Sequence, residues 1–124
     1  MISVGTDLIE IKRIEKSIKR AGFLKRILGN AEYLELKNRN FPIQSVAANF
    51  CAKEAFLKSV GKGLGEVDLR SIEVLREKSG KPYFKLTNIN WLDKSINFSV
   101  SITHTKEYAL AFVVAEHGNK NEED

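Results

Sequence analysis

The stretch AANFCAKEAFLKSVGKGLG, residues 47–65, has the pattern of a buried helix that ends in a glycine-rich loop, yet it carries a carboxylate in its apolar stripe. At 100° per residue, Glu54 lies within about 40° of Phe50, on the face that holds the large apolar side chains. Because an isolated buried carboxylate is costly, we expect Glu54 to be paired with a cation, protonated or bound to a metal ion. An ion pair with Lys58, one turn further on, is one interpretation; a metal ligand or a general base is the other.

The composition predicts one soluble domain. The chain has 124 residues, of which 43% are hydrophobic and 29% charged. Charges interrupt the N-terminal apolar run too early for a secretory signal, and no window approaches the ~18 consecutive apolar residues of a transmembrane helix. The single cysteine, Cys51, excludes an intrachain disulfide and is more typical of a core residue than of a nucleophile. We therefore expect a cytoplasmic protein without membrane association.

Positive charge is concentrated between residues 12 and 26. The whole chain has a net charge of +4, but this segment has seven bases against one acid, a local charge of +6. The bases are Lys12, Arg13, Lys16, Lys19, Arg20, Lys25 and Arg26. Such clustering indicates an anionic partner. A small nucleic-acid-binding module would also use this stripe, but it would leave Glu54 unexplained, and the sequence has no zinc spacing or RNA-binding aromatic motif.

The order of elements predicts an α+β fold. We expect a short strand at residues 2–4, then a helix from Asp7, which forms a capping box with Glu10. Further helices are expected over 23–28, 31–38 and 42–60, and strands over 71–77, 83–86, 97–103 and 108–115. Helices first and strands later favour N-terminal helices, one of them long and central, packed on a mainly antiparallel sheet. Residues 1–116 would form a single domain, and 117–124 a polar tail.

Three further features suit phosphate chemistry, and each also has a simple structural explanation. Asp7 would serve as a helix N-cap, although magnesium binds such carboxylates together with phosphate oxygens and water. The loop 61–65, with Lys62, lets backbone N–H groups approach an anion, but it also fits a helix C-cap. His104 continues the alternation of the strand over 97–103, where a structural histidine is the commoner outcome.

Four motifs together resemble the 4′-phosphopantetheinyl transferases, in their short bacterial form. They are Gly5-Thr6-Asp7, the segment Phe50–Lys58 with the glycine loop after it, Gly80-Lys81-Pro82-Tyr83, and Ser99–Thr105. The resemblance extends from Ile2 to about Glu116, and AKEAFLK with the upstream aspartate is its most specific part. It implies transfer of the phosphopantetheine arm of coenzyme A to a serine hydroxyl of apo acyl carrier protein, in fatty acid biosynthesis. Adenosine 3′,5′-bisphosphate would be the other product.

The resemblance also implies the site. Asp7 and Glu54 would bind Mg²⁺, Glu54 would accept the serine proton, and Lys58 would stabilise phosphate charge. The expected coenzyme A contacts are Lys53, Lys58, Lys62, Gly63, Pro82 and His104. The expected docking face for the acidic carrier protein consists of Arg13, Lys16, Arg20, Lys25 and Arg26. A noncatalytic carrier-protein-binding subunit would need only this basic face, and neither carboxylate.

Asn49 departs from the family pattern. Relatives commonly carry an arginine there that reaches a coenzyme A phosphate, so Lys53 or another base would have to replace its charge. The resemblance further implies a homotrimer with active sites between neighbouring subunits. Ala52, Ala55 and Phe56 lie off the main apolar stripe and are compatible with a subunit contact.

Overall fold

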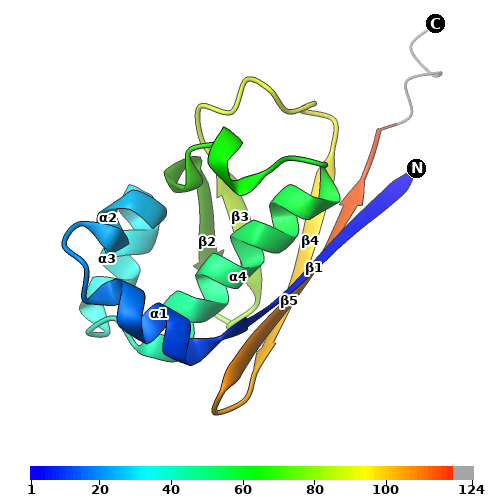
Figure 1. Cartoon of the computed structure of the whole chain (residues 1–124). Coiled ribbons are helices and arrows are strands. Elements are labelled where there is room, and N and C mark those ends of the chain that lie inside the picture. The colour runs from blue at the N-terminus through cyan, green and yellow to red at the C-terminus, as the bar shows by residue number, and fades with distance from the viewer. Residues whose placement is uncertain (119–124) are drawn as a thin grey trace, which may run out of the picture.

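The computed structural model describes residues 1–118, which fold with helices on one side of an antiparallel sheet (Figure 1). The sheet has three strands in the order β1-β5-β4, and a separate hairpin pairs β2 with β3. The strands are β1 (Ile2–Glu10), β2 (Ile72–Arg76), β3 (Pro82–Leu86), β4 (Asn97–His104) and β5 (Tyr108–Glu116). The predicted α+β class and the four later strands are confirmed.

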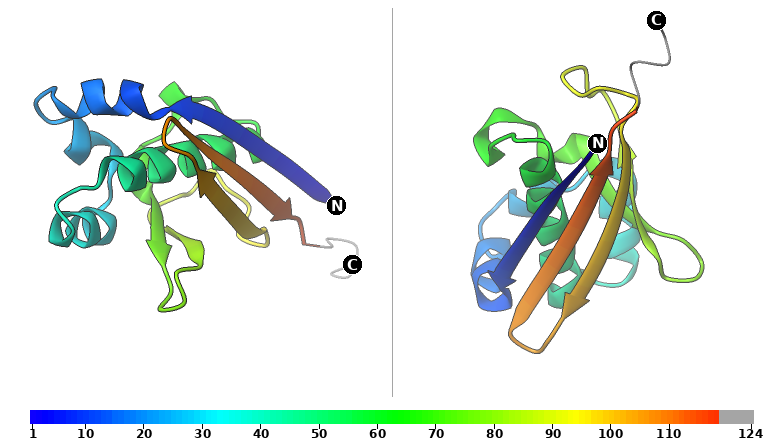
Figure 2. Two further views of the ribbon diagram at one scale, coloured as in Figure 1. Left: turned by 90° about the horizontal axis from the view of Figure 1, so that it is seen from below. Right: turned by 90° about the vertical axis from the view of Figure 1, so that its right-hand side faces the viewer.

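Four helices precede the later strands, as the sequence predicts. They are α1 (Ile11–Ile18), α2 (Phe23–Ile27), α3 (Asn30–Asn38) and the long α4 (Ile43–Ser59). Two short 3₁₀ turns follow, at Leu64–Glu66 and Leu69–Ser71. Helix α4 packs along the inner face of β1 and β5, and the hairpin covers another side of it (Figure 2). Among residues 1–118, no helix is both long and apolar enough to cross a membrane.

Helix α4 is the centre of the core, and it is buried on nearly all sides. Phe56 is fully buried and lies against Phe84 and Phe98, with ring centroids 4.9 Å and 4.3 Å apart. Ala52, Ala55 and Phe56 are all 0% exposed within a single chain. The expectation that they form a subunit contact is therefore wrong, because the chain's own sheet and hairpin cover them.

The first strand is longer than the sequence predicts, and the capping box is absent. Strand β1 runs to Glu10, Asp7 lies opposite Ala111 of β5, and α1 begins only at Ile11. Apolar residues on both faces of β1 mimic a helical spacing, whereas pairing with a strand about a hundred residues later extends it. Asp7 is consequently an inward-facing strand residue, which aims its carboxylate at α4.

On the outer face of the three-stranded sheet, β1 and β5 expose apolar side chains that the single chain does not cover, whereas the outward residues of β4 are polar. Val4, Leu8, Leu110 and Phe112 point outward and are between 39% and 59% exposed. At the end of the sheet, the His117 backbone N–H donates to the Met1 carbonyl (2.9 Å). The remainder of the predicted tail, apart from Gly118, lies outside the described residues.

Candidate active site

Strand β1 and helix α4 bring Asp7, Glu54 and Lys58 together. Asp7 is 9% exposed on the inner face of β1, and Glu54 is half-buried on α4. The Lys58 ammonium donates to Asp7 Oδ1 and to the Thr6 carbonyl, both at 3.1 Å. Lys58 thus forms its ion pair with Asp7, whereas the salt-bridge interpretation had expected a pair with Glu54.

The two carboxylates repel each other. Burial, and then the charge of Asp7, raises the pKa of the Glu54 carboxyl above its ordinary value. Lys58 and Arg13 partly offset this rise. A bound cation would stabilise such a pair at the edge of the core. Without a cation, Glu54 is a stronger base than an ordinary glutamate.

Cys51, on α4, contacts Asp7 through its thiol. Its thiol donates to the Asp7 carbonyl at 3.2 Å and lies 3.6 Å from Asp7 Oδ2. Burial, with the Asp7 charge adding to it, raises the pKa of the Cys51 thiol to about 12. Cys51 is therefore a neutral core thiol, as predicted, and not a nucleophile.

Lys62 and Gly63 lie in the loop after α4. The Lys62 backbone N–H donates to the Leu57 carbonyl at 3.0 Å and Gly61 has φ 70°, the geometry of a helix C-cap. The Lys62 ammonium lies 5.4 Å from the centre of the Trp91 ring and 4.0 Å from Glu66 Oε2. The loop therefore caps the helix and presents one lysine beyond the Lys58 end of α4.

Pro82 and His104 lie on a different side of the molecule. They line a hollow of about 640 Å³ between α3, α4 and the β2–β3 hairpin, together with Arg39, Arg76 and residues of the first turns of α4. Of the α4 residues that line the hollow, Gln44, Ser45 and Ala48 lie about 80°, 180° and 120° around the helix from Glu54, and Ser45 is roughly 14 Å away along its axis. Within one chain, the carboxylates and the hollow thus lie on different sides of α4.

Lys53 is the motif residue that the structure removes from the expected coenzyme A contacts. It is 0% exposed, and its ammonium donates to the Ile27 carbonyl, to Glu32 Oε1 at 2.7 Å and to the Leu69 carbonyl at 3.0 Å. All three of its hydrogens are used inside the core, so none is left for a ligand. Its signal in the sequence is the same as that of a ligand-binding lysine.

The predicted docking cations are exposed on one side of the molecule. Helices α1 and α2 and the turn between them carry Arg13, Lys16, Arg20, Lys25 and Arg26, all with exposed side chains. Arg13 is close enough to lower the pKa of Glu54, so the basic face borders the carboxylate pair. The structure therefore brings together the basic segment and the carboxylate pair, which the sequence presents as separate features.

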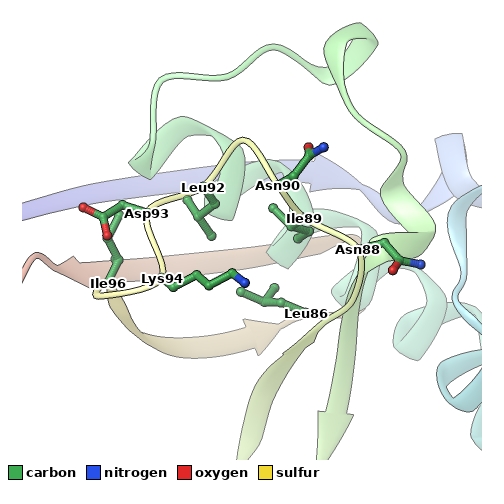
Figure 3. Close-up of a pocket in the computed structure, with 8 residues that line it drawn as sticks. All are labelled: Leu86, Asn88, Ile89, Asn90, Leu92, Asp93, Lys94 and Ile96. Atoms are coloured by element: carbon green, nitrogen blue, oxygen red, sulfur yellow. The ribbon is translucent and has the colours of Figure 1, made fainter.

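A second hollow lies under the loop between β3 and β4 (Figure 3). It has a volume of about 590 Å³ and is lined by Leu86, Asn88, Ile89, Asn90, Leu92, Asp93, Lys94 and Ile96. None of the residues singled out in the sequence lies in it.

Comparison with known proteins identifies the class. A family profile described as the 4′-phosphopantetheinyl transferase superfamily matches residues 3–113, and the chain belongs to this superfamily. Within it, the chain is an enzyme of the holo-[acyl-carrier-protein] synthase type, which confirms the resemblance seen in the sequence.

Proteins of that name resemble the chain over nearly their full length. The holo-[acyl-carrier-protein] synthase of Chloroherpeton thalassium is 44% identical over 119 residues, covering 93% of this chain and 98% of that protein. That of Clostridium beijerinckii is 42% identical, with 94% and 98% covered. The structure of the Neisseria meningitidis enzyme matches with a TM-score of 0.83 at 38% identity, covering 94% of this chain and 99% of that chain. The Bacillus anthracis enzyme, solved in complex with CoA (3′,5′-ADP), matches with a TM-score of 0.80 at 36% identity, with 94% and 96% covered.

Proposed function

We propose that this chain transfers the 4′-phosphopantetheine group of coenzyme A to a serine hydroxyl of apo acyl carrier protein, with Mg²⁺, in fatty acid biosynthesis. The observation that carries the proposal is the junction of Asp7, Glu54 and Lys58 beside a basic surface. A lone buried cysteine suits a reducing compartment, and we assign the reaction to the cytoplasm.

The residues present fit a hard divalent cation. Asp7 and Glu54 offer two carboxylates whose mutual repulsion a cation would relieve. Among residues 1–118 there is no cluster of three or more metal-ligating side chains, so the other coordination positions would fall to phosphate oxygens and water. Bound Mg²⁺ would neutralise the charge of the coenzyme A pyrophosphate.

The chain's own groups would carry the proton and the charge. The serine oxygen attacks the phosphorus that bears the pantetheine arm, and the bond from this phosphorus to the bridging oxygen breaks. Adenosine 3′,5′-bisphosphate leaves with that bond's electrons. Glu54 accepts the serine proton directly or through water, while Lys58 donates to a phosphate oxygen.

The site is completed by a second copy of the chain in this proposal. Pro82 and His104 line a hollow on another side of α4 from Glu54 within one chain, so a nucleotide that touches both regions would lie between two subunits. The uncovered apolar face of the sheet offers a surface for assembly into a homotrimer. The exposed cations of α1 and α2 would dock the acidic carrier protein beside Glu54, and no nucleic acid is needed to account for them.

The test is direct. The protein is incubated with apo carrier protein, coenzyme A and magnesium, and the carrier protein is weighed by mass spectrometry for an added phosphopantetheine. We expect Glu54→Gln, or chelation of the metal, to lower the rate by at least about 100-fold, because the base and a metal ligand are lost. Glu107→Gln, at an exposed glutamate in the turn between β4 and β5, serves as the control and should react normally. Wild-type turnover by Glu54→Gln would refute the assignment.

A further inference from the structure

The hollow lined by Pro82 and His104 also contains two arginines. Arg39 and Arg76 both line it, and its acidic member is Glu35. Glu35 already forms an ion pair with Arg39 at 3.4 Å, one helical turn away on α3. Arg76 makes no ion pair with any carboxylate of residues 1–118. The positive charge of this hollow therefore belongs to Arg76.

Arg76 is held in place by Asn49. Its Nη2 donates to Asn49 Oδ1 at 3.2 Å, and Asn49 is only 2% exposed. The Asn49 amide nitrogen donates to Glu32 Oε2 at 3.0 Å and to the Val74 carbonyl at 3.3 Å. A flipped amide would set its oxygen against these two acceptors and its nitrogen against the guanidinium. The orientation of Asn49 is thus fixed, and its oxygen must face Arg76.

The support continues into the core. Glu32 accepts hydrogen bonds from Lys53 at 2.7 Å, from the Gly29 backbone at 3.1 Å and from the Val74 backbone at 3.2 Å. Lys53, Glu32, Asn49 and Arg76 form one hydrogen-bonded chain that runs from the centre of the molecule to the hollow. An arginine positioned in this way loses little conformational entropy when it binds a ligand.

Arg76 is also short of a counter-ion. It is half-buried, and this burial lowers the pKa of the guanidinium from its ordinary value. One of its nitrogens is engaged by Asn49, and no further hydrogen bond from the guanidinium to the described residues is made. Its planar donors are suited to bidentate contact with a phosphate.

We propose that Arg76, positioned by Asn49, is the residue that anchors a terminal phosphate monoester in this hollow. The proposal rests on the proposed function, under which the ligand is the 3′-phosphate of coenzyme A. Arg76 then supplies, from strand β2, the positive charge that Asn49 lacks on α4. Lys53 is excluded from this role because it is fully buried and fully bonded.

The test compares two nucleotides that differ by this phosphate. Isothermal titration calorimetry with adenosine 3′,5′-bisphosphate and adenosine 5′-monophosphate should show at least about tenfold tighter binding of the bisphosphate, equivalent to ~1.4 kcal/mol. Arg76→Gln should remove this preference and leave the monophosphate affinity unchanged. Arg70→Gln, an exposed arginine paired with Asp68 at 2.9 Å, is the matched control and should keep the preference. In transfer assays, Arg76→Gln should raise KM for coenzyme A but not for 3′-dephospho-coenzyme A, with kcat unchanged.

Equal binding of the two nucleotides by the wild type, or a preference that survives in Arg76→Gln, would overturn the subsite. If Arg76→Gln does not fold, Arg76→Lys retains the charge without the planar fork and should weaken the preference; an unchanged preference would again overturn it. A wild type that prefers the bisphosphate through Arg76 but transfers nothing would leave the subsite standing and reject the proposed function. A wild type that transfers, but whose preference for the bisphosphate does not depend on Arg76, would support the proposed function and reject the role of Arg76.

Discussion

Lys53 and Glu54 are neighbours in the sequence, yet the structure uses them in opposite ways. Lys53 ties the end of α2, the loop before β2 and Glu32 to the central helix, whereas Glu54 faces the edge of the core beside Asp7. Burial raises the pKa of Glu32 and lowers that of Lys53, so each charge is tolerated only because the other is present.

Removal of one partner should therefore be costly. We expect Lys53→Met to lower the free energy of unfolding by about 3–5 kcal/mol, because Glu32 is left as an unpaired buried charge. Urea denaturation followed by circular dichroism measures this change. Lys62→Met, at a partly exposed lysine of the following loop, should change stability by less than about 0.5 kcal/mol. The double variant with Glu32→Gln should recover part of the loss; no recovery would show that the pairing is not the cause.

At the level of single residues, the sequence predicts the carboxylates but not the role of the lysine. Glu54 is identified by a charge in an apolar stripe, and Asp7 by its motif. Lys53 has the same motif signal whether it contacts a ligand or the core. Its three acceptors lie between 16 and 26 residues away in the chain, and local spacing carries no information about them. The contact between Asn49 and Arg76, 27 residues apart, is hidden for the same reason.

At the level of elements, the site depends on how closely β1 approaches α4. Gly5 allows this approach: a Cβ there would collide with the Ala55 carbonyl oxygen and lie 2.6 Å from the Ser59 nitrogen. The glycine was expected to end a short strand, but it lies inside a longer one. Local propensity could not extend that strand, because its partner β5 lies at the other end of the chain.

Gly5→Ala should consequently push α4 away from β1. We expect a loss of about 1–3 kcal/mol in stability from overpacking, and a fall in transfer activity because Asp7 and Glu54 move apart. Thermal unfolding and the transfer assay measure the two effects on the same sample. Gly65→Ala provides the control for the unfolding measurement, since a Cβ at that position meets no atom within 4 Å. Activity that stays normal in a destabilised Gly5→Ala would separate the packing from the chemistry.

Helix α1 offers a second prediction at this scale. Lys16→Glu combined with Arg20→Glu should raise KM for carrier protein by roughly tenfold at low salt, with KM for coenzyme A nearly unchanged. Arg13 is left in place because it lowers the pKa of Glu54, so its loss would disturb the site itself. Lys78→Glu with Lys85→Glu reverses two exposed charges on the hairpin and should leave both constants unchanged. Equal effects on both substrates would argue against a docking face.

At the level of the whole molecule, two surfaces support the proposed assembly of several copies of the chain. The outer face of the sheet exposes apolar side chains on β1 and β5, with Leu8 directly opposite Leu110. The carboxylate pair and the hollow that contains Arg76 lie on different sides of α4. A pattern of alternating residues in the sequence identifies strands, but it does not reveal that the exposed apolar residues of β1 and β5 are neighbours until the pairing is known.

Phe112→Lys tests this arrangement, because it places a charge in the middle of the outer face without touching the core. Under the proposed assembly, sedimentation should give a mass near three chains for the wild type and near one for the variant. Transfer should fall with the assembly, since each site would lack the residues of a neighbour. Leu34→Lys is the control: this leucine of α3 is 58% exposed but lies away from the sheet. A Phe112→Lys monomer that transfers at the wild-type rate would mean that one chain holds the complete site, and the opposed faces of α4 would then need to be served by a ligand that wraps around a single subunit.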